Sequence, residues 1–360
     1  MIKPIKNILL SSIFLGVVLT GCSNANNNNT QVPEDTAPVV DEIVTIDSPA
    51  VEETMPEEVE DVIDFEQVHM NIGVLRGPTG LGMLGVMDID HEFYNIDLFG
   101  APDEIAPQLI QGNLDFAAVP SNLASILYNN TNGAVQVVAI NTLGVLHILD
   151  TTGEIQSISD LAGHTIFLSG LGAVPEFALN YVLRKNGLEP GVDVTLEFRA
   201  EHPEIAALMQ SGAAQVALLP EPFATTVYNS VEDAQFALDL TTEWEKVAPD
   251  YSNLIMGVLV ARREFLEAHP EATAAFLSDY ENSINLVNAD VPFAAELAAQ
   301  FDIIPNAAIA EAAIPRSNIV FITGTQMESA LTGFLSVLYD ELPQSIGGTM
   351  PEADFFYMSN

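Results

Sequence analysis

Short apolar runs alternate with helical patterns along the chain, and the alternation restarts halfway. The first series has apolar runs at 70–75, 94–99, 116–119 and 135–140, and the second has them at 165–168, 194–198 and 216–219. Helical patterns fall between or beside these runs, at 81–87, 174–186 and 205–211 among others. Strands that alternate with helices predict an α/β fold with open, mainly parallel sheets, and the restart predicts two such sheets in succession.

The two series also resemble each other locally. Residues 109–120 and 208–220 each contain a helix end at a glycine, Gly112 or Gly212, then a short turn, a buried strand and a proline. Ligands of open α/β sheets bind beyond the carboxyl ends of the strands, where helix N-termini offer free N–H groups. Two such edges that face each other predict a ligand cleft between two lobes.

Cys22 is the only cysteine of the chain. It directly follows the sequence Leu-Thr-Gly and an apolar stretch at 8–19, which is too short for a membrane span of about 20 residues. We therefore expect residues 1–21 to be a lipoprotein signal peptide and Cys22 to carry acyl chains such as palmitate, which anchor the protein at the extracytoplasmic face of the cell membrane. The alternative is an ordinary secretory signal with a chance cysteine.

Acidic residues dominate the composition, with 50 Asp and Glu against 10 Lys and Arg and a formal net charge of −40. This charge excludes nucleic acid as a partner. Residues 22–66 are acidic and rich in proline and asparagine, so we expect them to form a disordered tether. Adaptation to salt or alkaline surroundings is our interpretation of the acidity, and steering of a cationic ligand is the alternative.

Four motifs in the remaining chain carry a family likeness. They are Gly77-Pro78-Thr79-Gly80, Gly-Leu-Gly-Ala-Val-Pro-Glu at 170–176, Leu-Arg-Lys-Asn-Gly-Leu at 183–188 and Leu-Pro-Glu-Pro-Phe-Ala-Thr at 219–225. Together they resemble the solute-binding lipoproteins of nitrate, sulfonate, taurine and thiamine-precursor type ABC importers, over residues 68–355. The resemblance implies a two-lobed periplasmic-binding-protein type II fold that captures a small polar or aromatic solute and delivers it to a permease with its ATPase subunit. No motif singles out one solute.

The expected organisation follows from the resemblance and from the strand pattern. We expect lobe 1 at 67–145 plus 255–360, lobe 2 at 150–250, and a hinge near 141–149 and 250–258. We further expect a monomer that needs neither a cofactor nor a metal ion.

The ligand site is predicted at strand ends of both lobes. Lobe 1 contributes Arg76, Thr79, Gly80, Ser121, Asn122, Asn141 and Thr142, and lobe 2 contributes Ser169, Gly170, Val174 and Glu221. Hydroxyl and amide groups in this set donate and accept hydrogen bonds. The alternatives are that Ser121 or Asn122 only caps its helix and that Gly170 only permits a tight turn.

Arg76 and Glu221 are the two charges in this set, and they point to opposite ligands. An arginine binds a carboxylate, sulfonate or phosphate, whereas a glutamate suits an amine or an aminopyrimidine. Alternatively, the two neutralise each other or form structural salt bridges. His147, Tyr228 and Trp244 either stack on a flat ligand ring or pack in the protein.

Catalytic motifs are missing from the sequence. It has no metal-ligand spacing among its histidines, no Gly-x-Ser-x-Gly and no phosphate loop. We therefore expect a binding protein rather than an enzyme. The alternatives are an extracytoplasmic enzyme or sensor on the same scaffold, and a surface interaction protein with a vestigial cleft.

Overall fold

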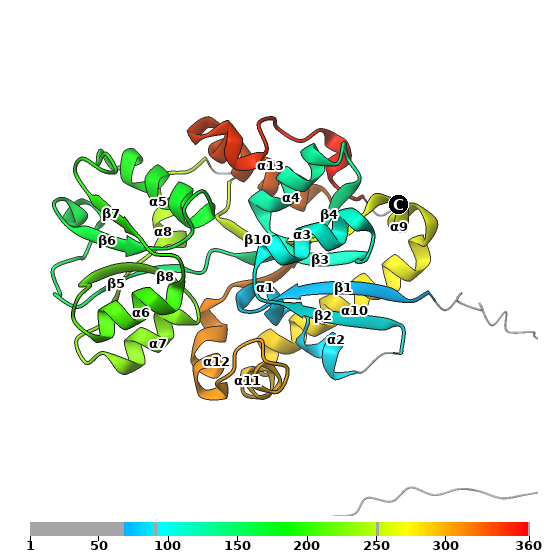
Figure 1. Cartoon of the computed structure of the whole chain (residues 1–360), viewed down its shortest axis with the longest axis horizontal. Coiled ribbons are helices and arrows are strands. Elements are labelled where there is room, and N and C mark those ends of the chain that lie inside the picture. Colours follow the sequence, from blue (N-terminus) through cyan, green and yellow to red (C-terminus); the bar gives the residue numbers. More distant parts are fainter. Residues whose placement is uncertain (1–67, 90–91, 250–251, 359–360) are drawn as a thin grey trace, which may run out of the picture. The chain divides into compact units, whose positions relative to one another are not determined.

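The computed structural model describes residues 68–89, 92–249 and 252–358, and it contains two β-sheets (Figure 1). The signal peptide, Cys22 and the tether expected at 1–66 lie outside the described residues. Helices cover both faces of each sheet (Figure 1). The predicted fold class, an α/β fold with two lobes, is confirmed.

The first sheet has six strands in the order β11-β4-β10-β3-β1-β2. Strand β1 runs parallel to β2 and β3, whereas β10 runs antiparallel to β3 and β4, and β11 runs antiparallel to β4. The strands are β1 (Met70–Leu75), β2 (Tyr94–Phe99), β3 (Phe116–Pro120), β4 (Val135–Leu143), β10 (Ile255–Arg262) and β11 (Ile319–Ile322).

The second sheet has five strands in the order β7-β6-β8-β5-β9. Strand β6 runs parallel to β7 and β8, and β5 runs antiparallel to β8 and β9. The strands are β5 (Leu146–Asp150), β6 (Thr165–Leu168), β7 (Thr195–Phe198), β8 (Val216–Pro220) and β9 (Gln235–Asp239). Both sheets are therefore mixed, because β10 and β11 in the first sheet and β5 in the second run opposite to the other strands.

The helices of the first sheet and its surroundings are α1 (Pro78–Leu81), α2 (Leu84–Asp88), α3 (Pro102–Gln111), α4 (Ser121–Asn130), α9 (Arg263–Ala268), α10 (Pro270–Ala289), α11 (Val291–Gln300), α12 (Ala307–Ala313) and α13 (Gly324–Glu341). Those of the second are α5 (Val174–Lys185), α6 (His202–Gln210), α7 (Phe223–Ser230) and α8 (Leu240–Glu245). Short 3₁₀ turns are η1 (Ile158–Leu161), η2 (Ile314–Arg316), η3 (Pro343–Ile346) and η4 (Ala353–Phe355). Within the described residues, we find no helix with the length and apolarity needed to cross a bilayer.

Burial explains which segments become central strands. Strands β3 and β8 are apolar and buried along four consecutive residues, because helices cover both of their faces. The edge strands β2 and β7 alternate between more and less exposed residues instead. One apolar cluster runs through both sheets and includes α4, α5, α8 and α13, and separate clusters lie under α10 and α11 and under α6 and α7.

The helix predicted at 81–87 is instead two short helices, α1 and α2. Ser283 of α10 lies against the break, where its Oγ accepts a hydrogen bond from Gly85 N at 2.7 Å and donates one to Gly82 O at 2.6 Å. A Cβ on Gly85 would lie 2.9 Å from Ser283 Cα. The glycines therefore permit a close approach of α10, and Ser283 replaces the helical hydrogen bonds that the break removes.

Candidate functional site

Two sheet edges carry the predicted site residues. In the first sheet, the carboxyl ends of β1 and β3 share an edge with the start of β10, because Gly257 pairs with Pro120. In the second sheet, the carboxyl ends of β6 and β8 share an edge with the start of β5, because Leu146 pairs with Pro220. The chain passes from β4 to β5 over only Gly144 and Val145, so this link joins the two carboxyl edges directly.

The link itself lies against both halves of the molecule. Glu221 N, just beyond β8, donates a hydrogen bond to Val145 O at 3.0 Å, and the Asn318 side chain donates one to Gly144 O. A Cβ on Gly144 would lie 2.0 Å from Thr241 Oγ1 of α8. Gly144 is thus required for the close passage of the link beside α8.

Three predicted residues meet at the edge of the first sheet. Thr79, Asn141 and Thr142 surround Gly257, where a Cβ would lie 2.6 Å from Asn141 Oδ1 and 2.9 Å from Thr79 Cγ2. Asn141 Nδ2 donates to the hydroxyl of Tyr280 at 3.0 Å, and Thr142 Oγ1 donates to Asn141 Oδ1 at 3.0 Å. The amide of Asn141 is buried and already bonded, whereas Thr79 is partly exposed.

Ser121 and Asn122 are buried, and neither caps α4 through its side chain. Ser121 Oγ donates to Ile255 O at 2.6 Å, which joins the start of α4 to the start of β10. Asn122 Nδ2 donates to Ser345 O at 3.2 Å. The capping alternative is wrong for both residues, because long-range carbonyls, not the free amides of α4, are the partners of these side chains.

Arg76 and Gly80 flank the turn after β1. Arg76 forms a salt bridge with Asp302, with Nη2 and Oδ2 3.0 Å apart, and both side chains are substantially exposed. Gly80 is buried, and a Cβ there would lie 2.3 Å from Leu75 O. The chain therefore needs a glycine here to turn back against its own strand.

At the edge of the second sheet, Ser169 is paired with a histidine that the sequence analysis did not identify. Ser169 Oγ lies 2.6 Å from His202 Nδ1, and the His202 ring lies against the Phe223 ring, with centroids 5.2 Å apart. Burial lowers the pKa of His202 to about 4, so this imidazole is neutral at neutral pH. The pair is an uncharged donor and acceptor at the end of β6.

Gly170 and Val174 shape the turn that follows Ser169. Gly170 has φ of 83°, and its Cβ position lies 3.1 Å from the Pro175 ring, so the turn requires a glycine. Val174 is buried at the start of α5. The side chain of Val174 contributes packing, and any contact with a ligand would come through its backbone.

Glu221 forms an ion pair with Arg316 of η2, which sequence reasoning missed. Arg316 Nε lies 2.6 Å from Glu221 Oε1, Arg316 Nη2 donates to Thr225 Oγ1, and the guanidinium lies over the Phe236 ring. Glu221 is fully buried, and its other oxygen accepts from Thr225 N at 3.1 Å. The alternative that Arg76 and Glu221 neutralise each other is therefore wrong, because each has another partner.

This pair joins the end of β8 in the second sheet to a turn beside β11 in the first. The Arg316 side chain is 37% exposed, whereas that of Glu221 is 0% exposed. Removing one partner of a buried pair costs about 3–5 kcal/mol, because a charge is left without compensation. Glu221 thus depends strongly on Arg316. Only the scarcity of basic residues pointed toward Arg316 in the sequence, since no motif surrounds it.

The three aromatic candidates have different environments. Trp244 is fully buried between Tyr181 and Phe334, and its Nε1 donates to Ser252 O at 3.2 Å, so it is a core residue. His147 is also buried, which lowers its pKa. Tyr228 is half exposed beside the Phe236 ring.

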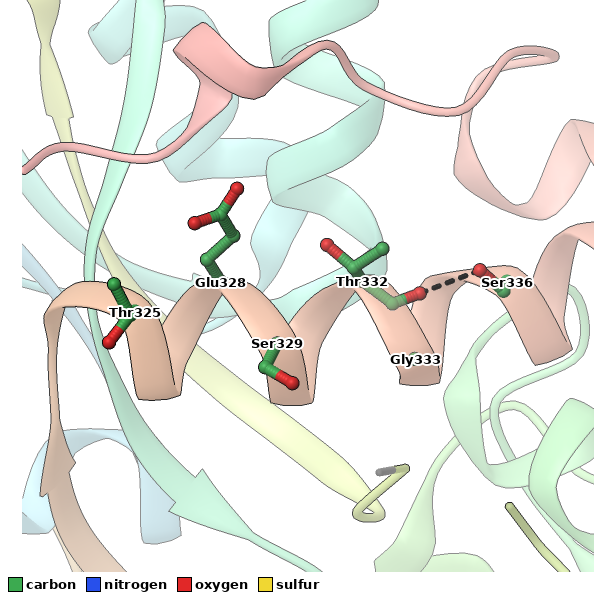
Figure 2. Close-up of a pocket in the computed structure, with 6 residues that line it drawn as sticks. All are labelled: Thr325, Glu328, Ser329, Thr332, Gly333 and Ser336. Carbon is green, nitrogen blue, oxygen red and sulfur yellow. Dashed lines mark hydrogen bonds between the residues drawn. The ribbon is translucent and has the colours of Figure 1, made fainter. Parts of the chain in front are cut away.

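A shallow pocket of about 340 Å³ lies elsewhere, along one face of α13 (Figure 2). Figure 2 shows that the labelled lining residues all come from this helix, and none of them is a predicted site residue. We prefer the two carboxyl edges as the candidate site, because several elements of both sheets contribute polar groups there. Among the described residues, no cluster of His, Cys, Asp and Glu has the arrangement of a metal site.

Several solved structures share this fold. An ABC transporter protein from Parabacteroides distasonis has a TM-score of 0.70 and 20% identity, with 81% of this chain and 100% of that chain covered. The periplasmic aliphatic sulphonate binding protein SsuA from Escherichia coli has a TM-score of 0.65 and 13% identity, covering 81% and 92%. The zinc-bound ligand-binding component of an ABC-type import system from Staphylococcus aureus has a TM-score of 0.62 and 16% identity, covering 81% and 96%.

These likenesses define the fold as that of the periplasmic solute-binding components of ABC importers. No protein-family model matches the sequence, and a search of curated proteins finds no match. The two-lobed architecture expected from the motifs is thus confirmed at the level of the fold.

Proposed function

We propose that this protein is an extracytoplasmic solute-binding lipoprotein, which captures a small polar or aromatic solute between its two lobes and delivers it to the permease of an ABC importer. The observation that carries the proposal is the direct joining of the two carboxyl edges by the β4–β5 link. Both edges present hydrogen-bonding groups, and these edges are where open α/β sheets bind ligands.

We propose the lobe boundaries and hinge as expected from the sequence, with lobe 1 at 67–145 plus 255–360 and lobe 2 at 150–250. All strands except β5 (Leu146–Asp150) fall within these ranges, and the chain passes between the sheets at 144–145 and again between α8 and β10. The shortness of the link between β4 and β5, only Gly144 and Val145, supports a hinge at this place.

The same proposal includes the cellular setting. Acylated Cys22 anchors a monomer to the lipid bilayer, residues 22–66 tether it, and the permease and its ATPase subunit are the partners. Metabolic labelling with a palmitate analogue tests the anchor. Label on the parent chain and none on Cys22→Ser is the expected result.

Thr79 offers the most direct test of the binding site. We expect Thr79→Ala to weaken binding of any solute that raises the melting temperature of the purified protein, because the partly exposed Thr79 lies at the edge without being needed in the core. Thr195→Ala is the matched control, since Thr195 is exposed at the amino end of β7. Equal affinity of Thr79→Ala and the parent for a confirmed solute would place the site elsewhere.

One observation favours the alternative of an enzyme on the same scaffold. Ser169 Oγ lies 2.6 Å from His202 Nδ1, which is the distance at which a histidine activates a serine nucleophile. Among the described residues, we find no carboxylate that hydrogen-bonds to the His202 ring. Steady hydrolysis of p-nitrophenyl acetate that disappears in Ser169→Ala would favour the enzyme, and a melting shift without turnover favours the binding protein.

A further inference from the structure

The arginines at the two carboxyl edges are all held by carboxylates. Arg76, after β1, pairs with Asp302. Arg199, after β7, pairs with Glu197 and Glu204 at 3.3 and 3.6 Å. Arg316 pairs with the buried Glu221. Each guanidinium that a solute would meet at these edges therefore already has an anionic partner within the protein.

The other basic residues of the described chain are either paired or distant from the edges. Arg262 ends β10 and Arg263 follows it at the opposite end of the first sheet, where they pair with Asp115 and Asp354. Lys246, after α8, pairs with Glu243 at 2.7 Å. Arg184 and Lys185 lie at the far end of α5, a helix of 12 residues and about 18 Å.

The two histidines near the edge of the second sheet add no positive charge. His202 is bonded to Ser169, and His147 is buried with its Nδ1 3.7 Å from Asp239 Oδ2. Burial lowers the pKa of both rings, so both are neutral at neutral pH. The polar groups that complete the two edges are hydroxyls, amides and imidazoles without net charge.

We propose that the solute carries no negative charge, and that Glu221 makes this selection by withholding the Arg316 guanidinium from anions. This inference rests on the proposed function. An anion that leaves water needs a cationic or strongly donating partner, and the chain's charge of −40 repels it further. An uncharged solute needs only hydrogen bonds and an apolar surface, which Thr79, the Ser169–His202 pair and the Phe223 ring provide.

Release of Arg316 from its ion pair with Glu221 tests the selection directly. Glu221→Gln keeps the shape of the side chain and removes its charge, so Arg316 loses its anionic partner. We expect ethanesulfonate at low ionic strength to show no saturable binding to the parent full chain by calorimetry. Glu221→Gln should bind it at least tenfold more tightly than the parent, and Glu221→Gln with Arg316→Gln should lose that gain.

Asp302→Asn keeps the test decisive if Glu221→Gln does not fold. Asp302 is 57% exposed, so its substitution leaves the core intact while it frees Arg76 at the edge. The matched control is Asp354→Asn, which frees Arg263 at the opposite end of the sheet. Gain of ethanesulfonate binding in Asp302→Asn alone supports the proposal. No gain in folded Glu221→Gln and Asp302→Asn, or an equal gain in the control, overturns it.

Matched pairs of probes separate this inference from the proposed function. The pairs are ethanesulfonate with ethanesulfonamide, nicotinate with nicotinamide, and benzoate with benzamide. Binding of an uncharged member at least tenfold more tightly than its anion supports both ideas. If the parent prefers an anion and Arg316→Gln loses that preference, the inference that anions are excluded is overturned, whereas solute binding itself is supported. No binding of either kind counts against solute binding, and the inference falls with it.

Discussion

Substitution of Arg316 should destabilise the protein far more than substitution of another arginine in an ion pair. Arg316→Met keeps the length of the stem and removes the guanidinium, which leaves Glu221 fully buried with no cationic partner. Glu221 retains its hydrogen bond from Thr225 N at 3.1 Å. From the 3–5 kcal/mol range for breaking a buried pair, we expect a loss of about 3 kcal/mol in the free energy of unfolding.

Arg76→Met is the control, because it removes the same group from a pair in which Asp302 is 57% exposed. Exposed pairs contribute about 0–1 kcal/mol, so this variant should lose about 1 kcal/mol or less. Urea unfolding measures both losses, provided that the dependence of the free energy of unfolding on urea concentration is the same for each variant and the parent. In the double variant Arg316→Met with Glu221→Gln, part of the loss should return, since no buried charge remains. If Arg316→Met loses no more than Arg76→Met, the Glu221 pair does not stabilise the fold as argued.

Three other predictions concern stability. Gly257→Ala should destabilise the protein by about 1–3 kcal/mol, because its Cβ would lie 2.6 Å from Asn141 Oδ1. Gly153→Ala is the control, since a Cβ there meets no other atom and only backbone strain remains. Urea unfolding compares the free energies of unfolding of the two variants. His202 has a folded pKa of about 4 against about 6.5 unfolded, so the unfolded state binds more protons and stability falls as pH drops from 6.5 to 4. Between pH 6.5 and 4, the free energy of unfolding of His202→Gln should fall by about 2 kcal/mol less than that of the parent. Equal falls would contradict the lowered pKa of His202. Trp244→Ala should lower the free energy of unfolding by about 3–5 kcal/mol, because it leaves a cavity in the core, and calorimetry measures this loss. A small loss would mean that the surrounding core collapses into the space.

Local patterns predicted most of the strands of both sheets. The bounds of β1 and β2 agree with the apolar runs at 70–75 and 94–99. Strands β9 and β11, which lie at the edges of the two sheets and have one buried residue each, were missed. Strand β5 was taken as a crossing segment, because a five-residue buried run directly after β4 looks like a continuation of it.

Strand direction and charge partners lay beyond the reach of local patterns. The sequence predicted a second crossing near 250–258, where β10 begins, but not that β10 runs antiparallel, because direction depends on where the chain re-enters the sheet. Arg316 and Glu221 are 95 residues apart, and Arg76 and Asp302 are 226 apart. Such pairs form only in the folded chain, so the sequence identified Arg76 and Glu221 without their partners.

Strand β10 lies between β3 and β4 in the first sheet, although all five strands of the second sheet separate it from them in the sequence. A ribosome therefore completes every strand from β5 to β9 before it reaches β10. The second sheet therefore has all its strands before the first sheet does. Until β10 is synthesised, the edges of β3 and β4 that pair with it have unpaired backbone groups. In a growing chain, a chaperone that shields open strand edges would find them on β3 and β4.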